Sequence, residues 1–189
     1  MKLSHLLVAG ALVAGFAPVA HAQTVVQPRQ QLDSSRAAVR DAILMLRDSL
    51  QVVHAGGARM QRDFQSASEA ALLSRARIMR DGCTVSARAL PQARTVVASG
   101  PADTDKQRAA RATLLSEMDR LATSLAECQA TFSAWVEGRD GEAVRGYGNR
   151  AAETVRAPIL SYEDKLQRYL ALLGIRVQPL GVGSAPVAS

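Results

Sequence analysis

The sequence of 189 residues is poor in the side chains that most catalytic and metal centres use. It contains three histidines and two cysteines, and aromatic residues make up only 4% of it. No C-x-x-C, C-x-x-C-H or G-x-S-x-G motif occurs, and the glycines form no phosphate-binding loop. These absences argue against thiol redox chemistry, c-type haem, a serine nucleophile and a nucleotide site.

Long hydrophobic runs are also missing, since the apolar run at residues 6–16 is shorter than the roughly 20 residues that a membrane span needs. The run follows Lys2 and precedes the sequence Ala20-His21-Ala22. This order predicts a signal peptide over residues 1–22, cleaved before Gln23. Because the residue after the cleavage site is not cysteine, we expect no lipid anchor. The predicted destination is the bacterial periplasm or the medium.

Cleavage at this position leaves His54 as the only histidine of the mature chain. A metal site with several histidine ligands is thereby excluded within the chain, and we expect no cofactor. A b-type haem held by His54 and a methionine is the alternative, which an absorption spectrum would test.

The mature chain is basic, with 22 basic against 17 acidic residues, and all of its basic residues except Lys106 and Lys165 are arginine. Such a surface favours an anionic envelope component or an acidic protein as partner. The alternative is that the arginines reflect the nucleotide composition of the genome and cover solvated helix faces. No basic block with interleaved aromatic residues occurs, so nucleic acid is not an expected partner.

Apolar residues at helical spacing predict a first helix that starts near Asp33. They are Leu32, Val39, Ile43, Leu46, Leu50 and Val53. The same register continues at Met60, Phe64, Ala67, Ala71 and Ile78, although Gly56 and Gly57 interrupt it. We expect a break or bend at these glycines, because a complete turn would reset the phase of the pattern. Ser66 with Glu69 is a weak capping box in this region.

The second half of the sequence contains the clearest helical pattern. A less regular stretch from Gly82, which includes Pro91, ends in a loop that reaches about Asp103. Asp103 or Thr104 then caps a helix, whose stripe is Leu114, Met118, Leu121, Leu125, Cys128, Phe132 and Trp135. A turn at residues 138–141 leads to a last helix over about residues 144–173, which Gly174 ends.

These patterns predict an all-α fold, because no segment alternates with the period of two that is typical of strands. Short connections favour an antiparallel bundle of about four helices with coiled-coil-like stripes. An elongated helical hairpin is the alternative if the first helix runs unbroken through its two glycines. The expected organisation is a flexible lead (23–30), a single helical domain (31–176) and a disordered tail (177–189).

In an exported chain, Cys83 and Cys128 are expected to form a disulfide. A straight hairpin that turns at Gly100 would place them 17 and 28 residues from the turn. The mismatch is about 16 Å at the helical rise of 1.5 Å per residue, whereas a disulfide requires Cα atoms within about 7 Å. Part of residues 84–103 must therefore fold back, kink at Gly82 or Pro91, or be non-helical.

Most aromatic residues of the mature chain lie in its last third. Tyr162 and Tyr169 share a helix face. They could line a groove for an apolar or peptide partner. The candidate groove residues are Phe132, Trp135, Tyr147, Tyr162 and Tyr169. Core filling by the two C-terminal helices is the simpler interpretation of the same pattern.

Together these features predict an exported, non-enzymatic helical bundle that binds a partner or client protein in the bacterial envelope. The first alternative is a small all-α enzyme that acts on an anionic substrate through converging arginines, and the second is a ligand or haem carrier. The arginines considered for the enzyme are Arg36, Arg40, Arg47, Arg75, Arg77 and Arg80.

Overall fold

The computed structural model of the protein describes residues 33–181. The predicted signal peptide (1–22), the flexible lead (23–30) and the tail from residue 182 lie outside the described residues. Within that part, the chain forms four helices: α1 (Ser34–Asp63), α2 (Glu69–Ser99), α3 (Asp105–Glu137) and α4 (Gly141–Leu172).

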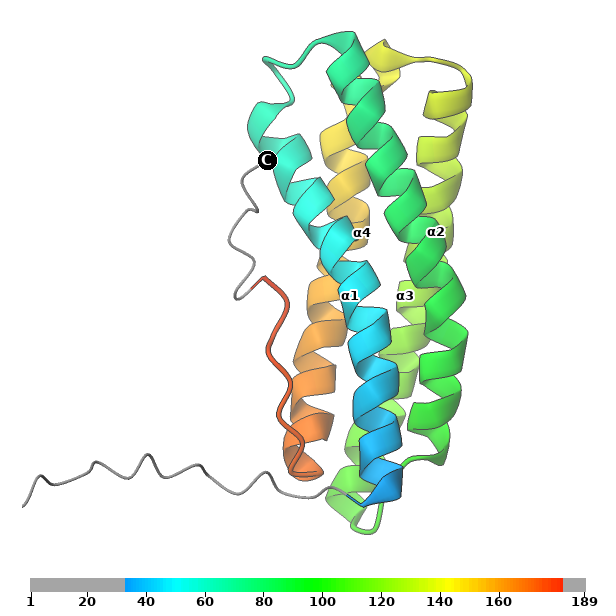
Figure 1. Ribbon diagram of the computed structural model, residues 1–189, viewed down its shortest axis with the longest axis vertical. Helices are drawn as coiled ribbons and strands as arrows, with labels where there is room; N and C mark the ends of the chain where they lie inside the picture. The colour runs from blue at the N-terminus through cyan, green and yellow to red at the C-terminus, as the bar shows by residue number, and fades with distance from the viewer. Residues whose placement is uncertain (1–32, 182–189) are drawn as a thin grey trace, which may run out of the picture. The chain divides into compact units, whose positions relative to one another are not determined.

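Successive helices run in opposite directions and form an antiparallel bundle (Figure 1). Each helix contacts the next, and α1 closes the bundle against α4. One apolar stripe from each helix meets in a common core, in which the side chains of Ile43, Leu72, Leu121 and Ile159 are 0% exposed. The predicted all-α bundle is confirmed, and the alternative of an elongated hairpin is wrong. No helix within the described residues is long and apolar enough to cross a membrane.

Each helix begins at a residue whose side-chain oxygen accepts a hydrogen bond from a backbone N–H in the first turn. These residues are Asp33, Ser68, Thr104 and Asp140. At Thr104 the capping box is complete, because Gln107 bonds back to the Thr104 backbone. The starts predicted at Asp33 and Thr104 are confirmed. The cap of α2 is Ser68 and not Ser66, so the capping box expected at Ser66 is wrong.

Helix α1 passes through Gly56 and Gly57 without a break, contrary to the break or bend expected there. The glycines allow neighbouring side chains to approach the helix closely instead. A Cβ atom on Gly56 would lie 2.8 Å from Met79 Sδ in α2, and one on Gly57 would lie 2.6 Å from Arg156 Cδ in α4. Contacts with α2 and α4 therefore offset the low helix propensity of glycine.

The chain turns at residues 64–68, and this turn shifts the apolar pattern by one residue. Continuation of the first register would bury Ala71 and Ile78, but Ile78 is 43% exposed. The residues that α2 buries are instead Leu72, Ala76, Met79 and Cys83, each 0% exposed. As expected of a turn, residues 64–68 reset the phase of the apolar pattern. The predicted continuation of the first stripe to Ala71 and Ile78 is therefore wrong.

Cys83 and Cys128 form the predicted disulfide, with their Cα atoms 6.2 Å apart. Helix α2 stays continuous through Gly82 and Pro91, so of the three options only a non-helical segment is realised, at residues 100–104. Its five residues can span about 16 Å when extended. They carry the chain onward, so that α3 begins beyond the end of α2 (Figure 1).

A second contact between α2 and α3 shows the same alignment of the two helices as the disulfide does. Arg94 Nε donates to Asp119 Oδ1 at 2.6 Å. Helix α2 ends at Ser99, and α3 begins at Asp105. Cys83 lies opposite Cys128, and Arg94 opposite Asp119, only if the first two turns of α3 extend beyond the end of α2. There Gln107 Nε2 donates to the Leu172 carbonyl oxygen at the end of α4.

Helix α4 ends in a Schellman motif. Gly174 has φ +70°, its N–H donates to the Ala171 carbonyl, and the Ile175 N–H donates to the Leu170 carbonyl at 2.9 Å. The predicted stop at Gly174 is confirmed. The left-handed conformation of this glycine reverses the chain and sends the following residues back along the bundle.

Candidate functional site

The aromatic residues that the sequence grouped as a candidate groove lie mainly in the core. The side chains of Phe132, Tyr162 and Tyr169 are 0% exposed. Trp135 is half-buried and meets the Phe132 ring edge to face, with centroids 5.2 Å apart. Tyr147 is 58% exposed. The structure therefore does not gather the five rings along one open groove, and three of them fill the bundle interior.

An open apolar groove lies instead between α1 and α2. Two adjoining hollows of about 260 Å³ and 330 Å³ share Val52 and Ile78 as lining residues. Val52, Ile78 and Val85 are 47%, 43% and 54% exposed. We call this surface the α1–α2 groove and define it by Ser49, Val52, Gly56, Ile78, Gly82 and Val85.

Two glycines line the α1–α2 groove where the helices pack closely. At Gly82 a Cβ would lie 3.0 Å from Val53 Cγ2 and 3.4 Å from Val52 Cγ1, so α1 and α2 come close at this point. Gly56 lines the other hollow, and a Cβ there would lie 2.8 Å from Met79 Sδ. The exposed side chains of Val52 and Ile78 line both hollows beside these close contacts.

The sequence contained a signal for this surface that the core stripes obscured. Val52 in α1 is seven residues after Met45, and Val85 in α2 is seven residues after Ile78. All four are large apolar residues, and all are exposed, Met45 at 63%. Apolar residues off the core stripe at heptad spacing on two adjacent helices predict a second apolar seam.

Charged side chains differ between the two ends of the α1–α2 groove. Arg59 and Arg75 line the hollow nearer the turn at residues 64–68. Asp81 lines the other hollow and forms an ion pair with Arg80, with Nε and Oδ1 2.8 Å apart. The first hollow has no carboxylate or histidine among its lining residues. It can attract an anionic group, but none of those lining residues is an acid or base for proton transfer.

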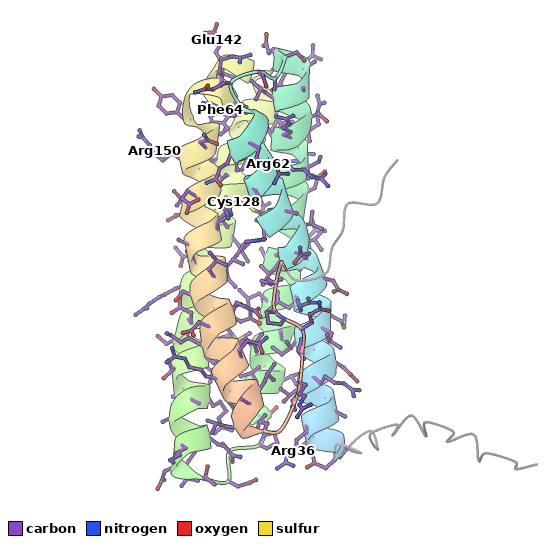
Figure 2. The ribbon with its side chains drawn as sticks, turned by 90° about the vertical axis from the view of Figure 1, so that its left-hand side faces the viewer. Arg36, Arg62, Phe64, Cys128, Glu142 and Arg150 are labelled. Carbon is purple, nitrogen blue, oxygen red and sulfur yellow. A yellow bond between two sulfur atoms is a disulfide. The ribbon has the colours of Figure 1, made fainter. Side chains whose placement is uncertain are left out.

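A second feature is the segment of residues 175–181 that follows α4, which has no regular secondary structure and which we call the strap. It lies between α4 and α1 and runs back along the bundle (Figure 2). Ile175 and Leu180 are buried, at 4% and 8% exposure. Residues 177–181, which the sequence analysis assigned to the tail, belong to this segment, and the buried Leu180 lies among them.

Helix α1 holds the strap through its backbone. Arg47 Nη2 donates to the Pro179 carbonyl oxygen at 3.1 Å. One helical turn further on, Gln51 Oε1 accepts a hydrogen bond from the Gly181 N–H at 3.1 Å. Neither contact depends on the side chain of the strap residue.

Helix α4 holds the other side of the strap in the same way. Gln167 Nε2 donates to the Val177 carbonyl oxygen at 3.3 Å, and Glu163 Oε1 accepts from the Leu180 N–H at 3.4 Å. Glu163 is only 8% exposed, and Gln167 Nε2 also donates to its carboxylate at 2.8 Å. A buried carboxylate thus contacts the strap backbone.

The titratable groups near the strap show two shifted pKa values. Burial, and then the charge of Arg156, lower the pKa of His54 below its usual range. Burial, and then the Glu163 carboxylate, raise the pKa of Tyr162. A Cβ on Gly181 would lie 3.5 Å from His54 Nε2, so the strap approaches the imidazole. At neutral pH both His54 and Tyr162 are uncharged.

The arginines that the sequence suggested for an anionic substrate have different partners. Arg36 pairs with Asp33 and Arg40 with Asp41, Arg47 contacts the strap, and Arg80 pairs with Asp81. Arg75 lines the α1–α2 groove with Arg59, which the sequence had not suggested. Among the described residues, no group of three or more histidine, cysteine or acidic side chains is placed to hold a metal ion.

Comparison with known proteins adds no relative. No protein-family model, no curated protein and no solved structure matches the chain. The disulfide is consistent with an oxidising location outside the cytoplasm. Any functional conclusion therefore rests on the two surfaces described above.

Proposed function

We propose that this chain is an exported, non-enzymatic helical-bundle protein that binds a partner or client protein in the bacterial envelope through the α1–α2 groove. The observation that carries the proposal is the row of exposed apolar side chains, Val52, Ile78 and Val85, along two connected hollows. Contiguous exposed apolar residues mark interaction sites more often than single ones do.

The shape and charge of the groove favour an amphipathic helix with acidic residues at one end. Two parallel walls at heptad spacing suit the side-chain ridge of a third helix. Arg59 and Arg75 at one end would attract carboxylates beyond the apolar face of that helix. The net positive charge of the mature chain acts in the same direction at longer range.

The enzymatic alternative receives less support from the same surface. Two arginines do line one hollow, but its wall residues Val52 and Ile78 are nearly half exposed, so the hollow is open to water. A site of this kind would bind an anion without excluding solvent from it. We therefore assign Arg59 and Arg75 to partner binding and not to catalysis.

A matched pair of variants tests the proposal. Ile78→Asp places a charge in the α1–α2 groove, whereas Leu160→Asp places one at a similarly exposed leucine of α4, 47% against 43%. The probe is a synthetic amphipathic helix with leucines at heptad spacing and glutamates at one end. We expect Ile78→Asp to weaken its binding about tenfold or more, as at an interface anchor, and Leu160→Asp to leave it unchanged.

The charge of the probe supplies the second arm of the test. A peptide of the same length with lysines in place of the glutamates should bind more weakly to the wild-type chain, measured by fluorescence anisotropy at low and high salt. Equal effects of the two aspartate variants, or absence of binding by both peptides, would refute the assignment of the groove.

A further inference from the structure

The strap contacts the bundle as a bound peptide contacts its receptor. Beyond Ile175, four hydrogen bonds to α1 and α4 each join a side chain of the bundle to a backbone group of the strap. We propose that the cleft between α1 and α4 that the strap fills is a peptide-binding site, that the strap is its resident occupant, and that a Pro-Leu-Gly segment of a partner protein replaces it.

Two side chains of α1 hold the backbone on either side of the buried Leu180. Arg47 and Gln51 are four residues apart in α1, about 6 Å along the helix axis. Their partners, the carbonyl of Pro179 and the N–H of Gly181, flank Leu180 directly. One turn of α1 therefore fixes the strap backbone before and after its buried side chain.

Helix α4 supplies the opposite side with a pair at the same interval. Glu163 and Gln167 are also four residues apart, and they contact Leu180 and Val177. The order is reversed, because α4 and the strap run in opposite directions (Figure 2). Both helices thus read backbone groups, and this recognition places few demands on the sequence of the bound segment.

Selectivity comes from the buried side chain and from the residues that flank it. Leu180 is 8% exposed although it lies in a surface segment. Pro179 has no N–H to leave unsatisfied, and its carbonyl is the group that Arg47 contacts. Gly181 has φ +81°, which other residues adopt only with strain. The matching ligand is a segment in which proline, a large aliphatic residue and glycine follow one another, with the chain turning at the glycine.

The strap is suited to exchange because the hydrogen bonds to Arg47 and Gln51 are exposed to solvent. It competes as a tethered ligand, at an effective concentration in the millimolar range typical of short linkers. A free segment therefore binds with an affinity reduced by the fraction of time that the strap is bound. Gln51 also lines a hollow of the α1–α2 groove. A partner seated in that groove would bring an attached segment close to the strap.

The test uses the full mature chain and a fluorescein-labelled peptide with the sequence of residues 174–181. Leu180→Ser in the protein weakens the strap without altering the helices. We expect the variant to bind the peptide about tenfold or more tightly than the wild-type chain, because the cleft is open more of the time. A peptide that carries serine in place of its leucine should not bind the variant.

Gly181→Pro provides a second strap-weakening variant if Leu180→Ser does not fold. It removes the N–H that donates to Gln51 and is incompatible with φ +81°. Circular dichroism checks that either variant retains the bundle.

Two results would overturn the proposal. Equal binding of the peptide to wild-type and strap-weakened chains, or no binding to either, would mean that the strap is a fixed part of the fold. A concentration-dependent dimer of the wild-type chain that the peptide dissociates would assign the cleft to the strap of a second copy. Neither result depends on the Ile78→Asp variant that tests the α1–α2 groove. The proposal for the strap site can therefore be refuted while the proposal for the groove holds, and the reverse.

Discussion

Removal of the disulfide should lower the stability of the bundle by an amount that the chain length between its cysteines sets. Cys83 and Cys128 are 45 residues apart. On the loop-entropy model, a cross-link over this interval stabilises the fold by about 4 kcal/mol, mainly by restricting the unfolded chain. For a domain of this size, a loss of about 4 kcal/mol corresponds to a fall in melting temperature of roughly 8–16 °C.

The measurement is urea denaturation of the oxidised protein and of the Cys83→Ala/Cys128→Ala double variant. Both cysteines are buried, at 0% and 4% exposure, so the reduced wild-type protein serves as the control for lost packing of the sulfur atoms. The variant should also show a steeper dependence on urea, because its unfolded state exposes more surface.

A difference below about 1 kcal/mol between the oxidised and reduced forms would refute the reasoning. It would indicate that residues 84–127 remain associated in the denatured state, so that the bond restricts little. Detection of two free thiols in non-reduced native protein would show that the disulfide does not form.

Four further substitutions probe the helix packing and the buried titratable groups. Gly146→Ala should stabilise the protein by about 0.5–1 kcal/mol, because a Cβ there meets nothing within 4 Å. Gly82→Ala should destabilise it by about 1 kcal/mol, because the new Cβ would lie too close to the branched Val53 side chain. Urea denaturation measures both changes. Burial, and then a nearby guanidinium, lower the pKa of His54 from 6.5, so the unfolded chain binds the proton more readily and stability should fall as pH drops below 6.5. His54→Gln should flatten this limb of the urea midpoint plotted against pH; an unchanged slope would contradict the assignment. Burial raises the pKa of Tyr162 from 10.0, so stability should fall as pH rises above 10, and Tyr162→Phe should reduce that loss in the same assay.

The sequence predicted the fold class and the helices whose signals are local. Thr104 provides a hydroxyl directly before α3 and Gln107 completes its capping box, so the start of that helix depends on neighbouring residues alone. Leu114 to Phe132 repeat without interruption, and every one of these stripe residues is buried. The disulfide followed from the cysteine count and the expected export.

The features that sequence reasoning missed depend on contacts between distant residues. Gly56 is helical because Met79, far away in the sequence, occupies the space beside it. Ile78 has the side chain of a core residue, and only the one-residue shift at the turn places it at the surface. Leu180 lies in a segment whose composition is typical of disorder, yet its side chain is buried and side chains of α1 and α4 hold the backbone around it. Local composition contains no information about such contacts.

The aromatic residues left two interpretations open, a partner groove or core filling. Their concentration in the last third of the chain is real, but α3 and α4 turn Phe132, Tyr162 and Tyr169 inward. Heptad spacing identifies which residues share a helix face and does not say whether a partner helix of the same chain covers that face. The residues left uncovered were the smaller Val52 and Val85.

The position of the disulfide makes the bundle mechanically unequal. The bond joins α2 to α3, which are consecutive helices, whereas α1 and α4 are held to the rest by noncovalent contacts. Under tension applied at the two ends, α1 and α4 would peel away first, and the covalent loop of α2 and α3 would bear load without extending further. Limited proteolysis would accordingly degrade the outer helices and leave a resistant core of α2 and α3. A further cut at residues 100–104 would give two pieces that separate only after reduction.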